Sequence, residues 1–346
     1  MPDFKETDLK EANLLGSDLK EANLERAILK DANLRRANLE KAILRGADLE
    51  KANFEEANLK GADLENTNLK RANLVKAILE ESNLKRANLE RAILIEANLK
   101  RADLSKAILI EANLRRANLE RAILEEANLE RANLEKAILI EANLRKATLT
   151  KAILIEANLT RAILEETNLE RANLIETNLT ETNFIGANLE RTDLDWAIIK
   201  NSNLTGANFS GADLIGTNLE KVDLSGANLV KANILEANLI EANLKGADLE
   251  GANLFKANLE KANLEGANLK GTNFDGANFN GANLKGANLE GANLFIADFE
   301  GANLEARNLS FEQLSKVKTL YNAKVDTQFL IPLKYKFPAL FEEPTA

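Results

Sequence analysis

The chain has 346 residues and a formal net charge of −9, and it contains neither cysteine nor histidine. The missing cysteines exclude disulfides, thiolate metal sites and cysteine nucleophiles, and the missing histidines remove the commonest general base and transition-metal ligand. Because no apolar run of about 20 residues indicates a transmembrane helix, and because the acidic, polar start does not resemble a signal peptide, we expect a cytoplasmic protein.

The first predicted element is a run of five-residue repeats, A-(N/D)-L-x-x, which begins at Pro2 and continues without an insertion to Leu309. A period of five matches neither an α-helix nor a straight strand, because residues five apart share no face in either. The leucines at position three can share one interior only if the chain turns a corner every five residues. Positions one and three then point inward, position two points outward, and positions four and five form the turn. All 17 glycines occupy position five, as expected for a turn residue with positive φ.

The charges at position four indicate how many corners complete one coil. At a spacing of 20 residues they alternate in sign, as in Lys20, Glu40, Lys60 and Glu80. A coil of 15 residues would instead place like charges on adjacent strands, which is destabilising. The sequence therefore predicts a four-sided parallel β-helix of about 15 coils, about 75 Å long at a strand spacing of about 4.8 Å.

The uninterrupted A-(N/D)-L-x-x run covers most of the chain and resembles the pentapeptide-repeat family. The resemblance implies an all-β fold, a right-handed quadrilateral β-helix solenoid, for residues 1–310. It also implies two functional expectations. Some members of the family imitate B-DNA in shape and charge and inhibit DNA gyrase, and related proteins pair end to end. The family is abundant in cyanobacteria, which makes such a source plausible.

The remaining segment, residues 311–346, departs from the repeat. Ser310 and Gln313 have the spacing of a capping box, and the apolar residues that follow recur at helical spacing. We expect a helix over about residues 311–321 that caps the open end of the core, because a terminal coil exposes its core and its strand edges. Residues 323–325 are expected to return to the repeat pattern, and Pro332 and Pro338 to interrupt the remainder.

The repeats do not predict catalytic chemistry. An active site needs a concave pocket with converging polar groups, and no loop insertion builds one before residue 310. We therefore expect a protein that is not an enzyme and that has no cofactor. Asp193 and Asp213 lie one predicted coil apart, but on a flat face that cannot surround a cation, so no metal site is expected. The negative net charge disfavours direct nucleic-acid binding.

One column of outward side chains differs from the others. It consists of position-four residues spaced 20 apart and is apolar at 9 of its 15 sites, and Trp196 and Ile296 are the only large apolar residues at the adjoining position five. An exposed apolar ridge usually marks a contact surface, and tryptophan and phenylalanine are typical anchors. The predicted protein-binding residues are Ile175, Trp196, Ile215, Leu235, Phe255, Phe295 and Ile296. The alternative is a structural ladder, in which these side chains only join neighbouring coils.

These observations predict a non-enzymatic, rod-shaped scaffold or adaptor for protein–protein interaction. Its partner is a protein of unknown identity, without nucleic acid or membrane, and the chain is a monomer or an end-to-end homodimer. A DNA-mimicking inhibitor of gyrase is one alternative. It would need about 44 negative charges over a 75 Å length, judged from the charge spacing of duplex DNA, and the chain has a net −9. A self-assembling structural rod, joined through the N-terminal coil, is the other alternative.

Overall fold

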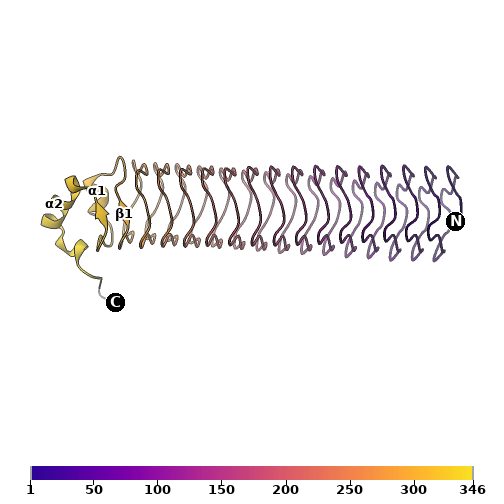
Figure 1. Ribbon diagram of the computed structural model, residues 1–346, viewed down its shortest axis with the longest axis horizontal. Helices are drawn as coiled ribbons and strands as arrows, with labels where there is room; N and C mark the ends of the chain where they lie inside the picture. The colour runs from indigo at the N-terminus through magenta and orange to yellow at the C-terminus, as the bar shows by residue number, and fades with distance from the viewer. Residues whose placement is uncertain (1, 345–346) are drawn as a thin grey trace. The chain divides into compact units, whose positions relative to one another are not determined.

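The structure is a computed structural model that describes residues 2–344. Its contacts divide the chain into two units, Met1–Asn178 and Leu179–Ala346, and each unit contains a stack of repeat coils (Figure 1). The division falls within the repeats, whereas the sequence predicts a change of structure only after residue 310. The candidate surface described below lies in the second unit.

Each coil contains 20 residues. The residue at position two forms a parallel β-bridge with the residue 20 positions later, as in Asn23 with Ile43 in the first unit and Asp193 with Asp213 in the second. Five-residue sides therefore close after four corners, which confirms the four-sided coil expected from the charges. The bridges involve one residue per side, so most of the repeat region contains no extended strand.

Every corner is a tight turn with one left-handed residue. In the repeat at Leu24, the Ala27 N–H donates to the Leu24 carbonyl over 3.1 Å, and the Arg26 N–H donates to the Arg45 carbonyl in the next coil over 2.8 Å. Arg26 itself has a φ of 54°. The same positive φ recurs at every fifth residue from Glu6 to Gly301. Lysine, arginine and glutamate thus adopt a backbone that costs about 1–2 kcal/mol for a residue with a Cβ, and the inter-coil hydrogen bonds offset this cost.

The inward positions build a dry core. From Leu19 onward the position-three side chains of the repeats are buried, and most are fully inaccessible, together with the alanines at position one. Where threonine replaces alanine, its hydroxyl finds a backbone partner, as Thr167 does by donating to the Leu144 carbonyl over 2.8 Å. Burial of these hydroxyls therefore leaves no unpaired donor, which would otherwise be costly.

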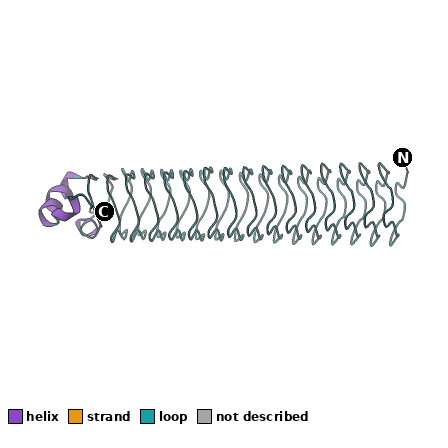
Figure 2. Cartoon of the chain, turned by 90° about the horizontal axis from the view of Figure 1, so that it is seen from below, coloured by secondary structure: helices purple, strands orange, loops and turns teal. Residues whose placement is uncertain are grey.

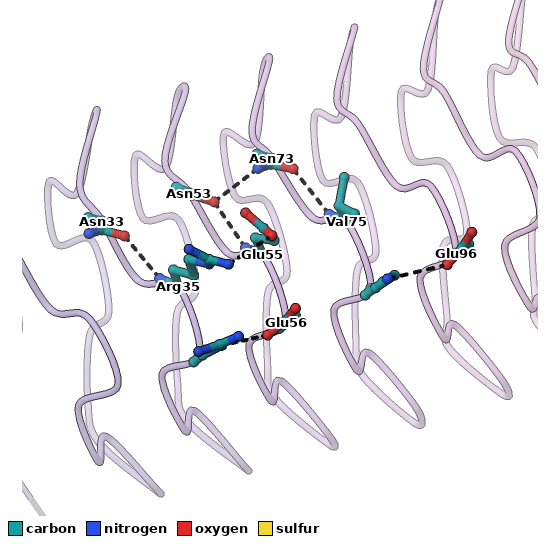
Figure 3. Close-up of polar contacts among 10 residues, drawn as sticks. Asn33, Arg35, Asn53, Glu55, Glu56, Asn73, Val75 and Glu96 are labelled. Atoms are coloured by element: carbon teal, nitrogen blue, oxygen red, sulfur yellow. Dashed lines mark hydrogen bonds and ion pairs between the residues drawn. The ribbon is translucent and has the colours of Figure 1, made fainter.

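The outer faces carry two kinds of ladder. The Asn73 amide donates to the Asn53 side-chain oxygen over 3.0 Å, and the same oxygen accepts from the Glu55 backbone N–H over 3.1 Å (Figure 3). Opposite charges also pair one coil apart, as in Lys20 with Glu40 at 3.2 Å and Lys100 with Glu120 at 3.0 Å. This pairing is the one that the alternation of charges predicts.

The second unit ends in short helices and a final strand pair (Figures 1 and 2). Strand β1 (Asn303–Leu304) pairs in parallel with β2 (Lys324–Val325), so the predicted return to the repeat pattern is confirmed. Helix α1 (Phe311–Leu314) lies between them, and α2 (Thr327–Lys336) and the 3₁₀ helix η1 (Pro338–Phe341) follow.

Two expectations for this segment need correction. The helix predicted over residues 311–321 begins at Phe311, with the expected capping box, but ends at Leu314. It ends there because the chain returns to the ladder of the preceding coil, where the Lys318 N–H donates to the Ala297 carbonyl over 2.9 Å. Pro332 lies inside α2 and does not interrupt it. The adjacent Leu333 is fully buried, and this packing offsets the hydrogen bond that proline cannot donate.

Candidate interaction surface

The structure separates the predicted binding residues into two groups. Ile175 belongs to the first unit and is half-buried there. In the second unit Ile215, Leu235 and Phe255 are half-buried, whereas the exposed fractions are 57% for Trp196 and 49% each for Phe295 and Ile296. The half-buried residues match the structural-ladder alternative, and the exposed residues match a contact surface.

The apolar column is not continuous. Asp275 occupies the same column between Phe255 and Phe295, and Asp195 occupies it before Ile215. The predicted residues from Ile175 to Ile296 are therefore separated by charged residues within their column. Among the predicted residues of the second unit, the exposed ones are Trp196 and, separately, Phe295 and Ile296.

Trp196 is held in place by the coil that follows it. Its six-membered ring lies over Gly216, so close that a β carbon added to that glycine would be 2.3 Å from Cζ3. The Trp196 N–H donates to the Ile215 carbonyl over 2.9 Å, and its φ is 60°. Its indole N–H has no acceptor among the residues that the structure describes. The absence of a side chain at Gly216 thus lets one face of the ring pack against the backbone, and the rest of the Trp196 side chain stays accessible.

Three carboxylates lie on the face that leads to Trp196. Asp193 and Asp213 are bridge partners in adjacent coils, and Asp195 Oδ1 accepts the Ile215 backbone N–H over 2.9 Å. Burial raises the pKa of Asp195, and the neighbouring charges of Asp193 and Asp213 raise it further, against the effect of the Ile215 hydrogen bond. Within residues 2–344, none of the three forms an ion pair with a lysine or an arginine. Glu220, by contrast, forms an ion pair with Lys200 over 2.6 Å.

The face beyond the Trp196 corner adds an exposed apolar residue. Ile198 follows two residues later and is 42% exposed. Isoleucine at position two of the repeats is explained by its high β-propensity and by duplication of the repeats. Its place beside Trp196 extends the exposed apolar area around the corner. We define the Trp196 surface as Trp196 and Ile198 with Asp193, Asp195 and Asp213.

The second exposed group adjoins α1. Phe295 lines a cavity of about 370 Å³ together with Asn308, Ser310, Gln313 and Lys316. The Ile296 N–H donates to the Lys316 carbonyl over 2.9 Å, so this coil is hydrogen-bonded to the segment that follows α1. The cavity has a mixed polar and apolar lining, and its two charged residues, Glu312 and Lys316, pair with each other over 2.8 Å.

The sequence does not single out Asp195 of the Trp196 surface or Gly216, on which the Trp196 ring packs. Gly216 was read only as a turn residue, although the 20-residue coil places it directly after Trp196 on the same corner. Asp195 is not among the predicted site residues, because its proximity to Asp213 follows only from the 20-residue coil. The spacing of Asp193 and Asp213 was noticed, and the structure confirms that they are side by side.

Neither a metal cluster nor a membrane helix is found in the part of the chain that the structure describes. Over residues 2–344 no three carboxylates converge in a way that could hold a metal ion. Over the same range no helix is long and apolar enough to cross a bilayer.

The geometry of the coils defines a parallel β-helix built from five-residue repeats. The family model described as "Pentapeptide repeats" matches in consecutive segments that run from residue 3 to residue 310. The chain therefore belongs to the pentapeptide-repeat family, whose members form right-handed quadrilateral β-helices. A comparison with curated proteins found no significant match.

Solved structures of pentapeptide-repeat proteins resemble the chain. HetL of the cyanobacterium Nostoc sp. strain PCC 7120, described as involved in the regulation of heterocyst differentiation, is 36% identical over 61% of this chain and 90% of its own, with a TM-score of 0.38. Rfr23 of the cyanobacterium Cyanothece 51142 is 40% identical over 28% of this chain and 63% of its own, with a TM-score of 0.26. QnrB1, described as a plasmid-mediated fluoroquinolone resistance protein, is 20% identical over 61% of this chain and 93% of its own, with a TM-score of 0.30.

Replacing Gly216 with alanine tests the packing of the Trp196 ring against Gly216. Gly206 is the matched control, because its φ is +64° against +62° at Gly216 and a β carbon there would meet nothing within 4 Å. Gly206→Ala should cost about 1 kcal/mol for the left-handed backbone alone. Gly216→Ala should cost more, and it should shift the emission of Trp196, the only tryptophan, because the ring must move. Urea unfolding followed by fluorescence measures both effects, and equal costs with unchanged emission would contradict this geometry.

Replacing Asp195 with asparagine tests the carboxylate cluster. Asparagine keeps an oxygen for the Ile215 N–H and removes the charge, so the variant should melt at the same temperature as wild type or slightly higher at pH 7. Because the pKa of Asp195 is raised in the folded state, the folded protein binds this proton more readily than the unfolded chain. The contribution of Asp195 to the stability of the wild type therefore falls as the pH rises from the ordinary pKa of aspartate through the raised pKa of the folded state. The advantage of the variant should shrink towards about pH 3, below the ordinary pKa of aspartate. An advantage that grows on acidification would refute the assignment.

Proposed function

We propose that this protein is a non-enzymatic protein-interaction scaffold that binds a protein partner through the Trp196 surface. The observation that carries the proposal is an exposed tryptophan whose ring is seated on Gly216 in the next coil. A large aromatic side chain that is already ordered loses little entropy on binding, which is why tryptophan is frequent among the residues that dominate interfaces.

The nature of the family supports a binding role, since pentapeptide-repeat proteins are generally structural or interaction proteins. The ladder of paired charges favours a scaffold over a DNA mimic. Acidic side chains such as Glu40 and Glu120 have a lysine one coil away, which neutralises the strip of negative charge that a mimic needs. A gyrase supercoiling assay should accordingly show no inhibition at micromolar protein, and inhibition would favour the mimic.

The proposal is tested by capturing partners with variants of the full chain. The variants are Trp196→Glu and, as a matched control, Ile185→Glu, because Ile185 is 41% exposed, apolar and in the same unit. Both are first checked for an unchanged circular dichroism spectrum. A protein from the lysate of the source organism that is recovered by wild type and Ile185→Glu, but not by Trp196→Glu, supports the proposal. Recovery of the same proteins by all three overturns it.

Phe295 and Ile296 are included as a second test surface. A double Phe295→Glu, Ile296→Glu variant changes an equally exposed apolar pair next to α1. Loss of the partner in this variant alone would move the binding surface to the end of the second unit and away from Trp196.

A further inference from the structure

The charges around Trp196 define which partner the surface fits. Many carboxylates of the repeats have a lysine or arginine one coil away, as Glu241 does with Lys221 and Glu265 with Lys245. Asp193, Asp195 and Asp213 have no such counterion within the described residues. Their negative charge is therefore available to a cation from outside the chain.

The three carboxylates do not form a metal site. Asp193 and Asp213 lie side by side in adjacent coils with Asp195 at the corner that follows, and over residues 2–344 no group of carboxylates converges on an ion. Asp195 already uses one oxygen for the Ile215 N–H, and Asp213 accepts the Asn233 amide over 3.3 Å. A divalent cation such as calcium needs six or more oxygens around it. The arrangement suits a cation that approaches from one side and brings its own hydrogen-bond donors.

Trp196 complements such a cation. One face of its six-membered ring rests on Gly216, and the side chain is 57% exposed. The face of an indole ring attracts ammonium and guanidinium groups within about 6 Å of its centroid. The chain itself uses this contact elsewhere, where the Lys256 ammonium lies 5.1 Å from the centre of the Phe255 ring. The free indole N–H can in addition donate to a backbone carbonyl of a bound segment.

We propose that the Trp196 surface binds a basic segment of its protein partner, with a lysine or arginine side chain against the Trp196 ring and its charge facing Asp193, Asp195 and Asp213. Ile198, on the next face, contacts the apolar part of that segment. The occupant is a peptide segment, because the surface offers an apolar contact, a hydrogen-bond donor and negative charge together. This inference rests on the proposed function and specifies the chemistry of the partner.

The test is a fluorescence titration of the full chain, in which Trp196 is the only tryptophan. The probe is an N-acetylated, C-amidated peptide of alternating glycine and lysine, and the same peptide with glutamine in place of lysine is the control. The lysine peptide should change the Trp196 emission saturably and more weakly at high salt, because the contact is electrostatic. The glutamine peptide should leave the emission unchanged.

Two double variants locate the charge that matters. Asp195→Asn with Asp213→Asn should weaken binding of the lysine peptide about fivefold, as expected for the loss of exposed ion pairs. Asp248→Asn with Asp275→Asn removes the same charge elsewhere in the second unit and should leave the affinity unchanged. Equal weakening by both pairs, or an equal response to the glutamine peptide, overturns the inference.

Failure of the basic-segment inference can be distinguished from failure of the proposed function. If Trp196→Glu abolishes partner capture while Asp195→Asn with Asp213→Asn leaves it intact, the scaffold proposal holds and the basic-segment inference fails. If Trp196→Glu leaves partner capture intact, the proposed function itself fails.

Discussion

Replacing Phe279 with alanine is expected to lower the free energy of unfolding of the second unit by about 3–5 kcal/mol. Phe279 is fully buried between two other rings. Its centroid lies 4.9 Å from Phe274, edge to face, and 4.7 Å from Phe299, stacked. Truncation removes the buried ring surface and both aromatic contacts, and it leaves a cavity in a core whose backbone is fixed by inter-coil hydrogen bonds.

The effect of Phe279→Ala should also be local. Repeat proteins are stabilised by contacts between neighbouring repeats, so the coils next to residue 279 should lose most protection. Hydrogen exchange measured by mass spectrometry reports this directly, together with urea unfolding. Phe295→Ala is the matched control, because the residue type is the same but the side chain is 49% exposed, and it should cost less than about 1 kcal/mol. Similar costs for the two variants would show that the core is not packed as described.

Replacing Gln313 with alanine is expected to lower the free energy of unfolding by about 2 kcal/mol, the second largest effect. The substitution removes a helix cap and the side-chain donor to two backbone carbonyls. Gln313 joins α1 to the last coil. Its Nε2 donates to the carbonyls of Leu289 and Ala292 over 2.8 and 2.9 Å, and its Oε1 accepts the Ser310 N–H over 2.9 Å. The side-chain amide thus donates to the Ala292 carbonyl, which in the repeats accepts a backbone N–H of the next coil, and adds a second donor to the Leu289 carbonyl, which also accepts the Ala292 N–H over 3.1 Å.

A conservative variant separates the two roles of Gln313. Gln313→Glu keeps the acceptor for Ser310 and loses the donor to Leu289 and Ala292, so it should be nearly as destabilising as Gln313→Ala. The control is Glu312→Gln, which removes only the exposed contact with Lys316 at 2.8 Å and should cost about 0.5 kcal/mol or less. Thermal unfolding and exchange at residues 289–292 measure the effects. A fully stable Gln313→Glu would show that the carbonyl contacts contribute nothing.

The coil could be predicted from the sequence because two independent patterns agree. The five-residue period requires a corner in every repeat, and the sign of the charges at Lys20 and Glu40 selects four corners. The contacts then follow, since Lys20 and Glu40 lie 3.2 Å apart. The left-handed backbone was expected from the glycines, but its presence at residues such as Arg26 could not be inferred from propensity. There the inter-coil hydrogen bonds override the local preference.

The end of the second unit was less predictable because its apolar spacing suits two structures. Residues 315–321 have a helical period, yet carbonyls at the backbone edge of the preceding coil, such as that of Ala297, would have no partner if this segment continued as a helix. Pairing with that edge ends α1 at Leu314. The candidate surface was partly predictable for a related reason. Trp196 is conspicuous in the sequence. Its contact with Gly216, and the proximity of three carboxylates that have no lysine or arginine partner within residues 2–344, depend on which side chains become neighbours after coiling.

The most direct test of the account is the affinity of the captured partner for wild type, Trp196→Ala and Ile185→Ala, measured by isothermal titration calorimetry. If Trp196 is the anchor of the surface, Trp196→Ala should weaken binding by about 30-fold or more, the loss typical of a dominant interface residue. Ile185→Ala, which removes an exposed apolar side chain from another column, should bind as wild type does. Equal affinities for all three proteins would contradict the assignment of the Trp196 surface as the place where the partner binds.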